Sequence, residues 1–337
     1  MTGGEEARYR RSPHLLVTWE GADMVLLQCN SLRRFRADPR LLTLLSRLGN
    51  WCTPADAGPA DGEGASREFL ERLQGMELVE PSDAPGAATH WTPFELAVQR
   101  QQNVGGERED LELEGTAPPA FKPRPSGPIT VLPPAVALDA RLDDVLTARR
   151  SVRTYGPGPL ALSDLSALLH HSARATDVVA DERLGEQVFH PYPAGGARSE
   201  LELYVVANQV DGVVPGAHWY DARAHELVLI RPGDDELVAV NEWVSDACGL
   251  DRPPQAMLVV TAVFERTMWK YQGIGLSLIA RDVGCLYQTL YLVATALGLA
   301  PCAVGGGREL DNDRWLGLDP LVESQVGCLL IGTREGG

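Results

Sequence analysis

The chain has 337 residues, 44% of them hydrophobic and 23% charged, which is the composition of an ordinary globular protein and leaves room for two domains. Its net charge of −16 argues against a nucleic acid or an anionic membrane as a partner, because both carry negative charge. The six cysteines form no CxxC pair, so neither a structural zinc site nor a disulfide framework is expected. We therefore expect a cytoplasmic protein without a metal site.

The first 85 residues have the pattern of a small winged-helix-like module. Alternating residues around Gly21 predict two short strands, and Asp38 followed by Pro39 predicts the start of a helix. A second helix is expected from residue 67, followed by a short strand at 76–80. Residues 1–90 contain 10 arginines against 13 acidic residues, so no basic face for DNA is apparent. Peptide binding, dimer packing or a cover over the main domain all remain open for this module.

Residues 86–135 are rich in proline and glycine and show little periodicity. A residue before proline is pushed away from helical geometry, which predicts an extended arm. Four apolar residues would dock this arm on the surface of the next domain: Phe121, Ile129, Val131 and Leu132.

The third segment, residues 136–337, mixes helices and strands. Helices are predicted at 142–149, at 160–174 with Ser163 as the N-cap, and within 232–250; strands are predicted at 201–208, 216–221, 227–230, 256–264 and 326–332. The longest apolar stretch, 274–299, carries Arg281 and Asp282, so it predicts a buried helix of the core or of a dimer interface, not a membrane span. Gly298 is expected to end that helix.

Lys270 and Tyr271 stand between a buried strand and this long helix. The chain contains 28 arginines but only two lysines, Lys122 and Lys270, so a surviving lysine suggests a position that arginine cannot fill. An ammonium in a desolvated site can give up its proton, whereas a guanidinium stays charged. The neighbouring phenol adds a second group that can donate or accept a proton.

Two further patterns indicate ligand binding. Arg149, Arg150, Ser151 and Arg153 place three guanidiniums and a hydroxyl within five residues, without an acidic residue among them, which favours an anion such as phosphate. Glycine pairs also occur at Gly195–Gly196 before a strand and at Gly305–Gly306 after one. Bare backbone at such positions allows close approach of a flat ligand.

The order of these motifs resembles the nitroreductase-like flavoenzymes and, more narrowly, the SagB-type or McbC-like dehydrogenases, which are azoline oxidases of thiazole/oxazole-modified peptide biosynthesis. The motifs are Arg-Arg-Ser-x-Arg-x-Tyr at 149–155, Pro-x-Gly-Gly at 193–196 before Leu-Glu-x-Tyr, Lys-Tyr at 270–271, Ala-Leu-Gly-Leu at 296–299 and the glycine-rich turn after 304. The resemblance covers residues 88–333. It implies an α+β fold, an FMN-binding α/β sandwich that dimerises with FMN at the subunit interface, with the winged-helix-like module in front.

The resemblance also assigns roles to residues. The FMN phosphate and ribityl chain would be held by Arg149, Arg150, Ser151 and Arg153, with Arg334 in reach of the phosphate. The flavin ring would lie near Pro193, Ala194, Gly195 and Gly196 on one side and near Gly305 and Gly306 on the other. Lys270 and Tyr271 match the catalytic Lys-Tyr pair of the azoline oxidases. The family often has serine where this chain has Ala194, so a hydrogen bond to flavin or substrate is missing there.

These assignments predict oxidation of azolines in a precursor peptide to thiazoles or oxazoles, with Lys270 as general base and Arg266 and the phosphate-binding arginines as cationic neighbours that favour its neutral form. The implied partners are that peptide, the cyclodehydratase of the same pathway and a second copy of the chain. Three alternatives remain: a reductase of dehydroamino acids in a modified peptide, a general NAD(P)H-dependent nitroreductase, and a flavin-free scaffold that docks the peptide. The precursor peptide and the preference for thiazoline or oxazoline stay open.

Overall fold

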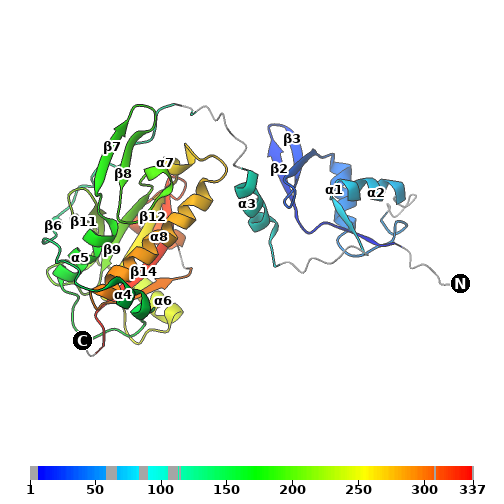
Figure 1. Ribbon diagram of the computed structural model, residues 1–337. Coiled ribbons are helices and arrows are strands. Elements are labelled where there is room, and N and C mark those ends of the chain that lie inside the picture. Colours follow the sequence, from blue (N-terminus) through cyan, green and yellow to red (C-terminus); the bar gives the residue numbers. More distant parts are fainter. Residues whose placement is uncertain are drawn as a thin grey trace. The chain divides into compact units, whose positions relative to one another are not determined.

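The computed structural model describes residues 7–57, 67–82, 90–104, 113, 115–306 and 309–335, without the side chains of 103–104 and 309–312. The chain divides into two compact units, Met1–Asp110 and Leu111–Gly337 (Figure 1). Each unit has its own core and is described by itself.

The described residues of the N-terminal unit form three helices and two small sheets. Its elements in order are β1 (Tyr9–Arg11), β2 (Leu15–Glu20), β3 (Asp23–Gln28), β4 (Arg33–Arg36), α1 (Pro39–Arg47), α2 (Arg67–Gly75), β5 (Val79–Pro81) and α3 (Pro93–Val104). Strands β2, β3 and β4 form one antiparallel sheet and β1 pairs with β5. The predicted two strands, two helices and final short strand are present, whereas β1 and β4 were not predicted.

The start of α1 follows the predicted rule. The Asp38 side chain accepts a hydrogen bond from the backbone N–H of Arg40 at 2.7 Å, and Pro39 occupies the first helical position. The helix contributes Leu45 to a core shared with α2 and the β1–β5 pair, whose fully buried members are Leu48, Ala57, Leu70 and Leu78.

The prediction of an extended arm over residues 86–135 is wrong for residues 93–104, which form helix α3. Thr92 and Glu95 form a capping box: the Glu95 carboxylate accepts from the Thr92 N–H at 3.0 Å and the Thr92 hydroxyl accepts from the Glu95 N–H at 3.3 Å. Pro93 therefore sits at the first helical turn, where its missing N–H costs nothing. The helix belongs to the N-terminal unit, where the Arg100 guanidinium donates to the Asn30 side chain at 2.8 Å.

The C-terminal unit is built on one seven-stranded sheet in the order β13-β14-β12-β9-β10-β11-β6, in which every neighbouring pair is antiparallel. Its strands are β6 (Ile129–Val131), β9 (Leu201–Ala207), β10 (Gly216–Asp221), β11 (Glu226–Pro232), β12 (Ala256–Val263), β13 (Ala300–Val304) and β14 (Glu323–Gly332). Its helices are α4 (Leu142–Ala148), α5 (Leu162–Ala173), α6 (Asp235–Cys248), α7 (Phe264–Met268), α8 (Gly275–Ala296) and α9 (Glu309–Leu316). A separate hairpin consists of β7 (Asp177–Asp181) and β8 (Gly185–Phe189), which were not predicted.

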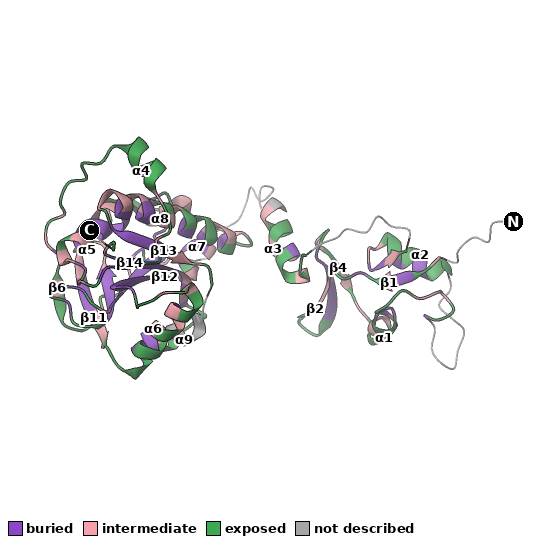
Figure 2. Ribbon diagram, turned by 90° about the horizontal axis from the view of Figure 1, so that it is seen from below, coloured by how far each residue is buried: buried purple, intermediate pink, exposed green. Residues whose placement is uncertain are grey.

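Helices cover the sheet on both faces, which explains why the central strands β9 and β12 are buried along almost their whole length. In β9, Leu203 and Val205 point to the face covered by α5 and α8, while Tyr204 and Val206 point to the face covered by α6 and α9. Figure 2 shows the buried strands β12, β13 and β14 with α8 on one side and α6 and α9 on the other. The predicted α+β sandwich is thus confirmed.

The start of α5 differs from its prediction. The helix begins at Leu162, and the backbone N–H groups of Asp164 and Leu165 both donate to the Ala161 carbonyl. Ser163 therefore lies inside the first turn and is not the N-cap. A hydroxyl residue near a helix start is only a weak guide to the first residue, because the ladder begins where the chain leaves the extended region.

Residues 118–132 are attached to the seven-stranded sheet of the C-terminal unit more by polar groups than by apolar side chains. The Lys122 ammonium contacts the Glu323 carboxylate at 2.9 Å and the Tyr204 hydroxyl, and β6 pairs with β11. Leu132 is buried as predicted, but Ile129 and Val131 are 53% and 68% exposed. Docking by those two side chains is therefore wrong, because their strand is attached by its backbone.

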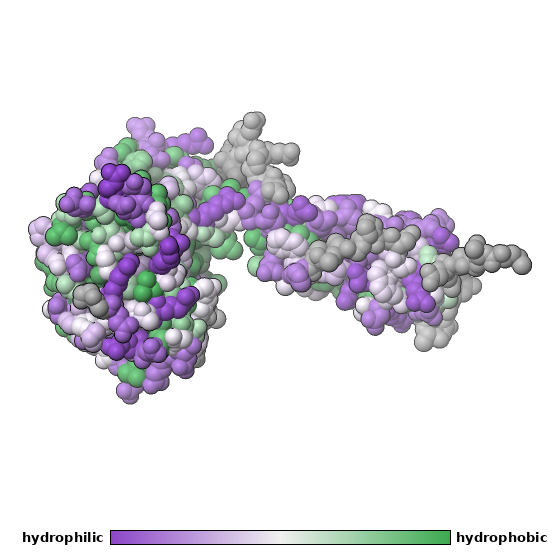
Figure 3. Space-filling model, turned by 60° about the horizontal axis from the view of Figure 1, so that its bottom comes forward, coloured by the Kyte–Doolittle hydropathy of each residue, from purple (hydrophilic) through white to green (hydrophobic). Residues whose placement is uncertain are grey.

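On the face shown in Figure 3, hydrophobic and hydrophilic residues of the C-terminal unit are interspersed. None of the helices in the described ranges has the combination of length and apolarity that a membrane crossing demands.

Replacement of Leu286, fully buried in the centre of α8, by alanine should lower the free energy of unfolding of the C-terminal unit by about 2–5 kcal/mol, because it removes buried methylene groups and leaves a cavity. The matched control is Leu276→Ala on the same helix, where the side chain is 45% exposed and the expected loss is within about 0.5 kcal/mol. Urea unfolding followed by near-ultraviolet circular dichroism measures both. Equal losses would contradict the packing of α8 described above.

Candidate functional site

Helix α8 connects the segments that carry the predicted ligand-binding residues. Near its beginning, Asp282 accepts a hydrogen bond from the backbone N–H of Gly195 at 2.8 Å. Two turns further on, the Tyr291 hydroxyl contacts the Ser151 hydroxyl at 2.8 Å and accepts from the Ala303 N–H at 2.7 Å. The nine positions that separate Asp282 from Tyr291 correspond to about 13 Å along the helix axis. The glycine turn and the arginine segment therefore lie along the same helix, some distance apart.

The glycine turn is brought directly against Lys270 and Tyr271. Gly196 has φ 69°, and a Cβ placed there would overlap the Tyr271 hydroxyl and lie 3.2 Å from Lys270 Nζ. Ala197 and Ser199, which follow it, also have positive φ values of 53°. Left-handed non-glycine residues are uncommon and indicate that the surrounding structure fixes this turn. The structure thus unites two motifs that are separated by more than 70 residues in the sequence.

Lys270 and Tyr271 are both half-buried and follow α7 directly, where their backbone N–H groups donate to the Thr267 carbonyl. Lys270 Nζ lies 5.1 Å from the centre of the Tyr271 ring. The pKa of Asp181, in the turn of the β7–β8 hairpin, is lowered by the backbone N–H groups of Leu184 and Arg183 and further by Lys270. The turn of the β7–β8 hairpin is therefore close enough to Lys270 for the ammonium charge to stabilise the ionised Asp181 carboxylate.

Arg266 does not serve as an uncompensated cation beside Lys270. Its guanidinium is 2% exposed, forms an ion pair with Glu202 at 2.8 Å, and donates to the Pro119 and Ser199 carbonyls at 3.0 and 2.7 Å. The phosphate-binding candidates lie at the other end of α8. Of the cations expected to favour a neutral Lys270, Arg266 is thus paired with Glu202, and the phosphate-binding candidates lie away from Lys270.

The arginine segment forms a cationic surface after α4. Arg150 and Arg153 are exposed, and the half-buried Arg149 lies 5.5 Å from the centre of the Tyr291 ring. No carboxylate of the described residues forms an ion pair with any of the three, although the chain is strongly acidic. Uncompensated guanidiniums gathered in this way are suited to an anion. Arg334 lies beside them, because its backbone bridges that of Tyr155, while its Nε donates to the Leu299 carbonyl at 3.0 Å.

The remaining predicted residues lie at the surface beside these groups. Pro193 is exposed and Ala194 half-buried at the entry to the glycine turn. Gly305 and Gly306 are exposed at the end of β13, and a Cβ at either position would meet nothing within 4 Å. Local packing therefore does not require glycine at 305 and 306, in contrast to Gly196.

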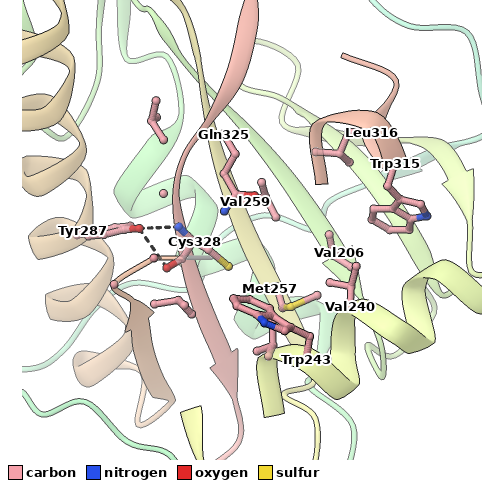
Figure 4. Close-up of a pocket in the computed structure, with 16 residues that line it drawn as sticks. Val206, Val240, Trp243, Met257, Val259, Tyr287, Trp315, Leu316, Gln325 and Cys328 are labelled. Carbon is pink, nitrogen blue, oxygen red and sulfur yellow. Dashed lines mark hydrogen bonds between the residues drawn. The ribbon is translucent and has the colours of Figure 1, made fainter. Parts of the chain in front are cut away.

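An apolar cavity of about 190 Å³ opens beside Gly305 and Gly306 (Figure 4). Trp243 of α6 and Trp315 of α9 line it together with side chains of β9 and β12, and Tyr287 of α8 stands at its edge. The Tyr287 hydroxyl accepts from the Cys328 N–H at 2.5 Å and donates to the Cys328 carbonyl at 3.1 Å. This cavity was not foreseen from the sequence.

Two buried carboxyl groups were also missed. Glu200 is fully buried just before β9, and Asp282 is 6% exposed within α8. Burial and the neighbouring Asp282 carboxyl raise the pKa of Glu200 to about 8. The sequence signal for Asp282 is an acidic residue inside an otherwise apolar helix, which indicates a buried carboxyl group with a specific partner.

The fold and the site define an α+β sandwich with arginines that lack carboxylate partners among the described residues and a Lys-Tyr pair beside an open backbone turn. The family model described as "Nitroreductase family" matches residues 146–333, more than half of the chain. The chain therefore belongs to the nitroreductase family, a family of FMN-dependent oxidoreductases, which confirms the resemblance seen in the sequence.

Individual relatives agree with this assignment. A Methanocaldococcus jannaschii protein named as a nitroreductase is 34% identical over 170 residues, which are 50% of this chain and 79% of that protein. The trifolitoxin-processing protein TfxB of Rhizobium leguminosarum is 29% identical over 182 residues, 53% of this chain and 49% of its own length. A solved structure from Anabaena variabilis, also named as a nitroreductase, has a TM-score of 0.52 at 22% identity over 69% of this chain and 45% of that chain, which shows the shared fold.

Replacement of Gly196 by alanine should destabilise the protein by about 1–3 kcal/mol, because the new Cβ would overlap the Tyr271 hydroxyl and the backbone has a positive φ. Addition of Tyr271→Phe should recover part of this loss by removing the overlapping oxygen. Gly305→Ala is the matched control and should change stability by less than about 0.5 kcal/mol, since nothing lies within 4 Å of its Cβ. Thermal unfolding of the parent, Gly196→Ala, Tyr271→Phe, the double variant and Gly305→Ala tests the contact, and a strictly additive double variant would contradict it.

Proposed function

We propose that this protein is an FMN-dependent azoline oxidase that converts azolines of a modified peptide to thiazoles or oxazoles. One observation carries the proposal: the structure gathers Gly196, Lys270 and Tyr271 at one end of α8, while arginines without carboxylate partners lie toward the other end. The motifs that resemble the SagB-type dehydrogenases are therefore neighbours along one helix. The trifolitoxin-processing relative supports a role in natural-product maturation.

The residues present fit FMN. Arg149, Arg150 and Arg153 would hold its phosphate, because their guanidiniums have no carboxylate partner among the described residues. Ser151 is oriented by Tyr291 at 2.8 Å and would contact the ribityl chain. Arg334, beside Tyr155, would complete the phosphate site.

The flat ring would lie against bare backbone. Gly195 and Gly196, preceded by Pro193 and Ala194, would approach it on one side, and the exposed Gly305 and Gly306 on the other. When bound, FMN supplies the acceptor for two electrons and one hydrogen of the substrate.

The side chains of the site would handle the proton. Aromatisation of an azoline removes two hydrogens from adjacent ring carbons, one of them as a proton. Lys270 would take this proton at Nζ, and Tyr271, whose ring centre is 5.1 Å from Nζ, would orient the amine or stabilise charge on the ring nitrogen. Their half-buried position would exclude part of the surrounding water.

A second copy of the chain is part of the proposal. Four exposed residues of α8 recur at every fourth position and include two small ones: Leu276, Ala280, Gly284 and Gln288. Small residues at this spacing allow another helix to approach closely, which would suit a homodimer. The further proposed partners are the azoline-containing precursor peptide and the cyclodehydratase that forms its azolines.

A small-molecule nitroreductase is the second candidate, favoured by the 34% identical relative that carries this name. One experiment separates the candidates: the mass of the precursor peptide, treated with its cyclodehydratase, with and without this protein. Loss of two hydrogens per heterocycle is expected for an azoline oxidase. A gain of two hydrogens would instead identify a peptide reductase, and an unchanged mass with a yellow protein a small-molecule enzyme. A colourless protein would favour a flavin-free scaffold.

Replacement of Arg153 by glutamine should weaken FMN binding by about 10–100-fold, because it removes a charged hydrogen-bond donor from the proposed phosphate site. Titration of the flavin-free protein with FMN, followed by quenching of flavin fluorescence, measures the dissociation constant. The control is Arg141→Gln at the start of α4, whose guanidinium is already paired with Asp143 at 3.0 Å and should not matter. Equal affinities of both variants would argue against the phosphate site.

Lys270→Ala should retain FMN and abolish oxidation of the peptide, since the general base is gone. Lys270→Arg is the sharper variant, because it keeps the positive charge and removes the ability to give up a proton. Both are assayed by peptide mass, with the flavin absorption spectrum as the control for binding. Full oxidation by either variant would remove Lys270 from the mechanism.

A further inference from the structure

Glu200 and Asp282 form a pair of buried carboxyl groups beneath the glycine turn. Glu200 is 0% exposed and Asp282 is 6% exposed. Neither carboxyl oxygen of Glu200 has a donor with hydrogen-bond geometry among the described residues. The neighbour that does reach it is the Asp282 carboxyl, which as a carboxylate can only accept. Two ionised carboxylates in such a place would repel each other, and only Asp282 has a hydrogen bond, from the Gly195 N–H, to offset its burial.

The two guanidinium groups near the pair form their hydrogen bonds with other groups and not with the Glu200 carboxyl. The Arg198 guanidinium donates to the carbonyls of Arg266, Leu184 and Pro118, and the Arg266 guanidinium is held by Glu202. The buried Tyr192 hydroxyl is also near, with its pKa raised by burial and then by Glu200.

The backbone N–H of Glu200 itself, the Thr267 hydroxyl of α7 and the charge of Arg198 favour an ionised Glu200. Burial and Asp282 outweigh them and raise the pKa of Glu200 to about 8.

We propose that Glu200 and Asp282 share one proton, and that this pair is a positioning device that fixes the Gly195–Gly196 turn against Lys270 and Tyr271. With the proton on Glu200, its O–H donates to one oxygen of Asp282, while the other oxygen, Oδ2, accepts the Gly195 N–H at 2.8 Å. Both carboxyl groups then have partners. The link from the turn to catalysis rests on the function proposed above, whereas the shared proton does not.

The close contacts around the Gly195–Gly196 turn explain why its position must be fixed by neighbouring side chains. A Cβ on Gly195 would lie 3.2 Å from Asp282 Oδ2, and one on Gly196 would overlap the Tyr271 hydroxyl. The turn is therefore confined between the carboxyl pair on one side and the Lys-Tyr pair on the other. Loss of the proton would place a second negative charge beside Asp282 and loosen the contact that holds Gly195.

The shared proton predicts a specific dependence of stability on pH. Glu200 binds its proton more tightly in the folded protein, with a pKa of about 8, than in the unfolded chain, with a pKa near 4.5. The contribution of this group to stability is therefore full below about pH 4.5 and is lost as the pH rises to about 8. Over this window it makes the unfolding equilibrium constant rise by up to about tenfold per pH unit.

Glu200→Gln is the decisive variant, because the amide copies the protonated carboxyl and can still donate to Asp282. Urea unfolding of the flavin-free protein at several pH values should show the variant gaining stability over the parent from pH 5 to pH 8. The matched control, Glu265→Gln, removes an exposed carboxylate from the neighbouring helix α7 and should run parallel to the parent. A Glu200→Gln profile parallel to the parent would overturn the shared proton.

A measurement on the unaltered protein keeps the proposal testable if the variant does not fold. Infrared spectroscopy at pH 7 should show the absorption of a protonated carboxyl group, which fades as the pH passes about 8. An infrared spectrum that shows only carboxylates at pH 7 would overturn the proposal.

The positioning role is tested by Asp282→Ala, which removes the acceptor of the Gly195 N–H. The dissociation constant of FMN should increase at least tenfold, with less change for Glu265→Gln, which alters only an exposed side chain of α7. Unchanged FMN affinity in Asp282→Ala would overturn the positioning role. If the parent protein bound no FMN, the proposed function would fail, while the infrared and pH results would still decide the carboxyl pair.

Discussion

Helix α8 holds the C-terminal unit together because it supplies partners for buried backbone groups of three separate segments. Asp282 accepts from Gly195 N–H, Tyr287 from Cys328 N–H and Tyr291 from Ala303 N–H. An unpaired backbone N–H in the interior costs about as much as a lost hydrogen bond, so each segment is fixed where α8 meets it. The apolar side of α8 is buried in the core, and the side chains of Asp282, Tyr287 and Tyr291 fix the three segments relative to the helix. The glycine turn, the edge of the sheet and the arginine segment are located by this one helix.

Some charged side chains inside the C-terminal unit have structural roles, and the sequence alone did not distinguish these from catalytic roles. Of the two lysines, Lys122 donates to Glu323 and Tyr204 and fastens residues 118–132 to the sheet. A compact ammonium with three donors suits that small buried site better than a planar guanidinium would. A lysine in this arginine-rich chain therefore marks a position with special requirements, but the requirement at Lys122 is structural: its contacts with Glu323 and Tyr204. Arg266 has the same kind of role through its ion pair with Glu202.

Local rules worked where the chain's own neighbours decide the structure. The Asp38 cap, the alternation in the strands and the apolar spacing of α8 all gave elements close to those observed. They failed where the signal was short or competed with another rule. Proline content suggested an extended arm around α3, although Thr92 and Glu95 form a capping box there. The β7–β8 hairpin is exposed on most of its residues and has no apolar alternation from which it could be predicted.

The sequence by itself determined the class of fold, the family and the identity of the candidate ligand-binding residues, because motif order and periodicity are properties of the chain. Only the tertiary structure decided which of them meet. Gly196 lies against Lys270 and Tyr271, whereas Arg266 is taken up by Glu202. It also revealed Glu200 beside Asp282, a pair separated by 82 positions in the printed sequence. Burial and electrostatic coupling depend on what surrounds a group in space, and no local pattern of residues records that.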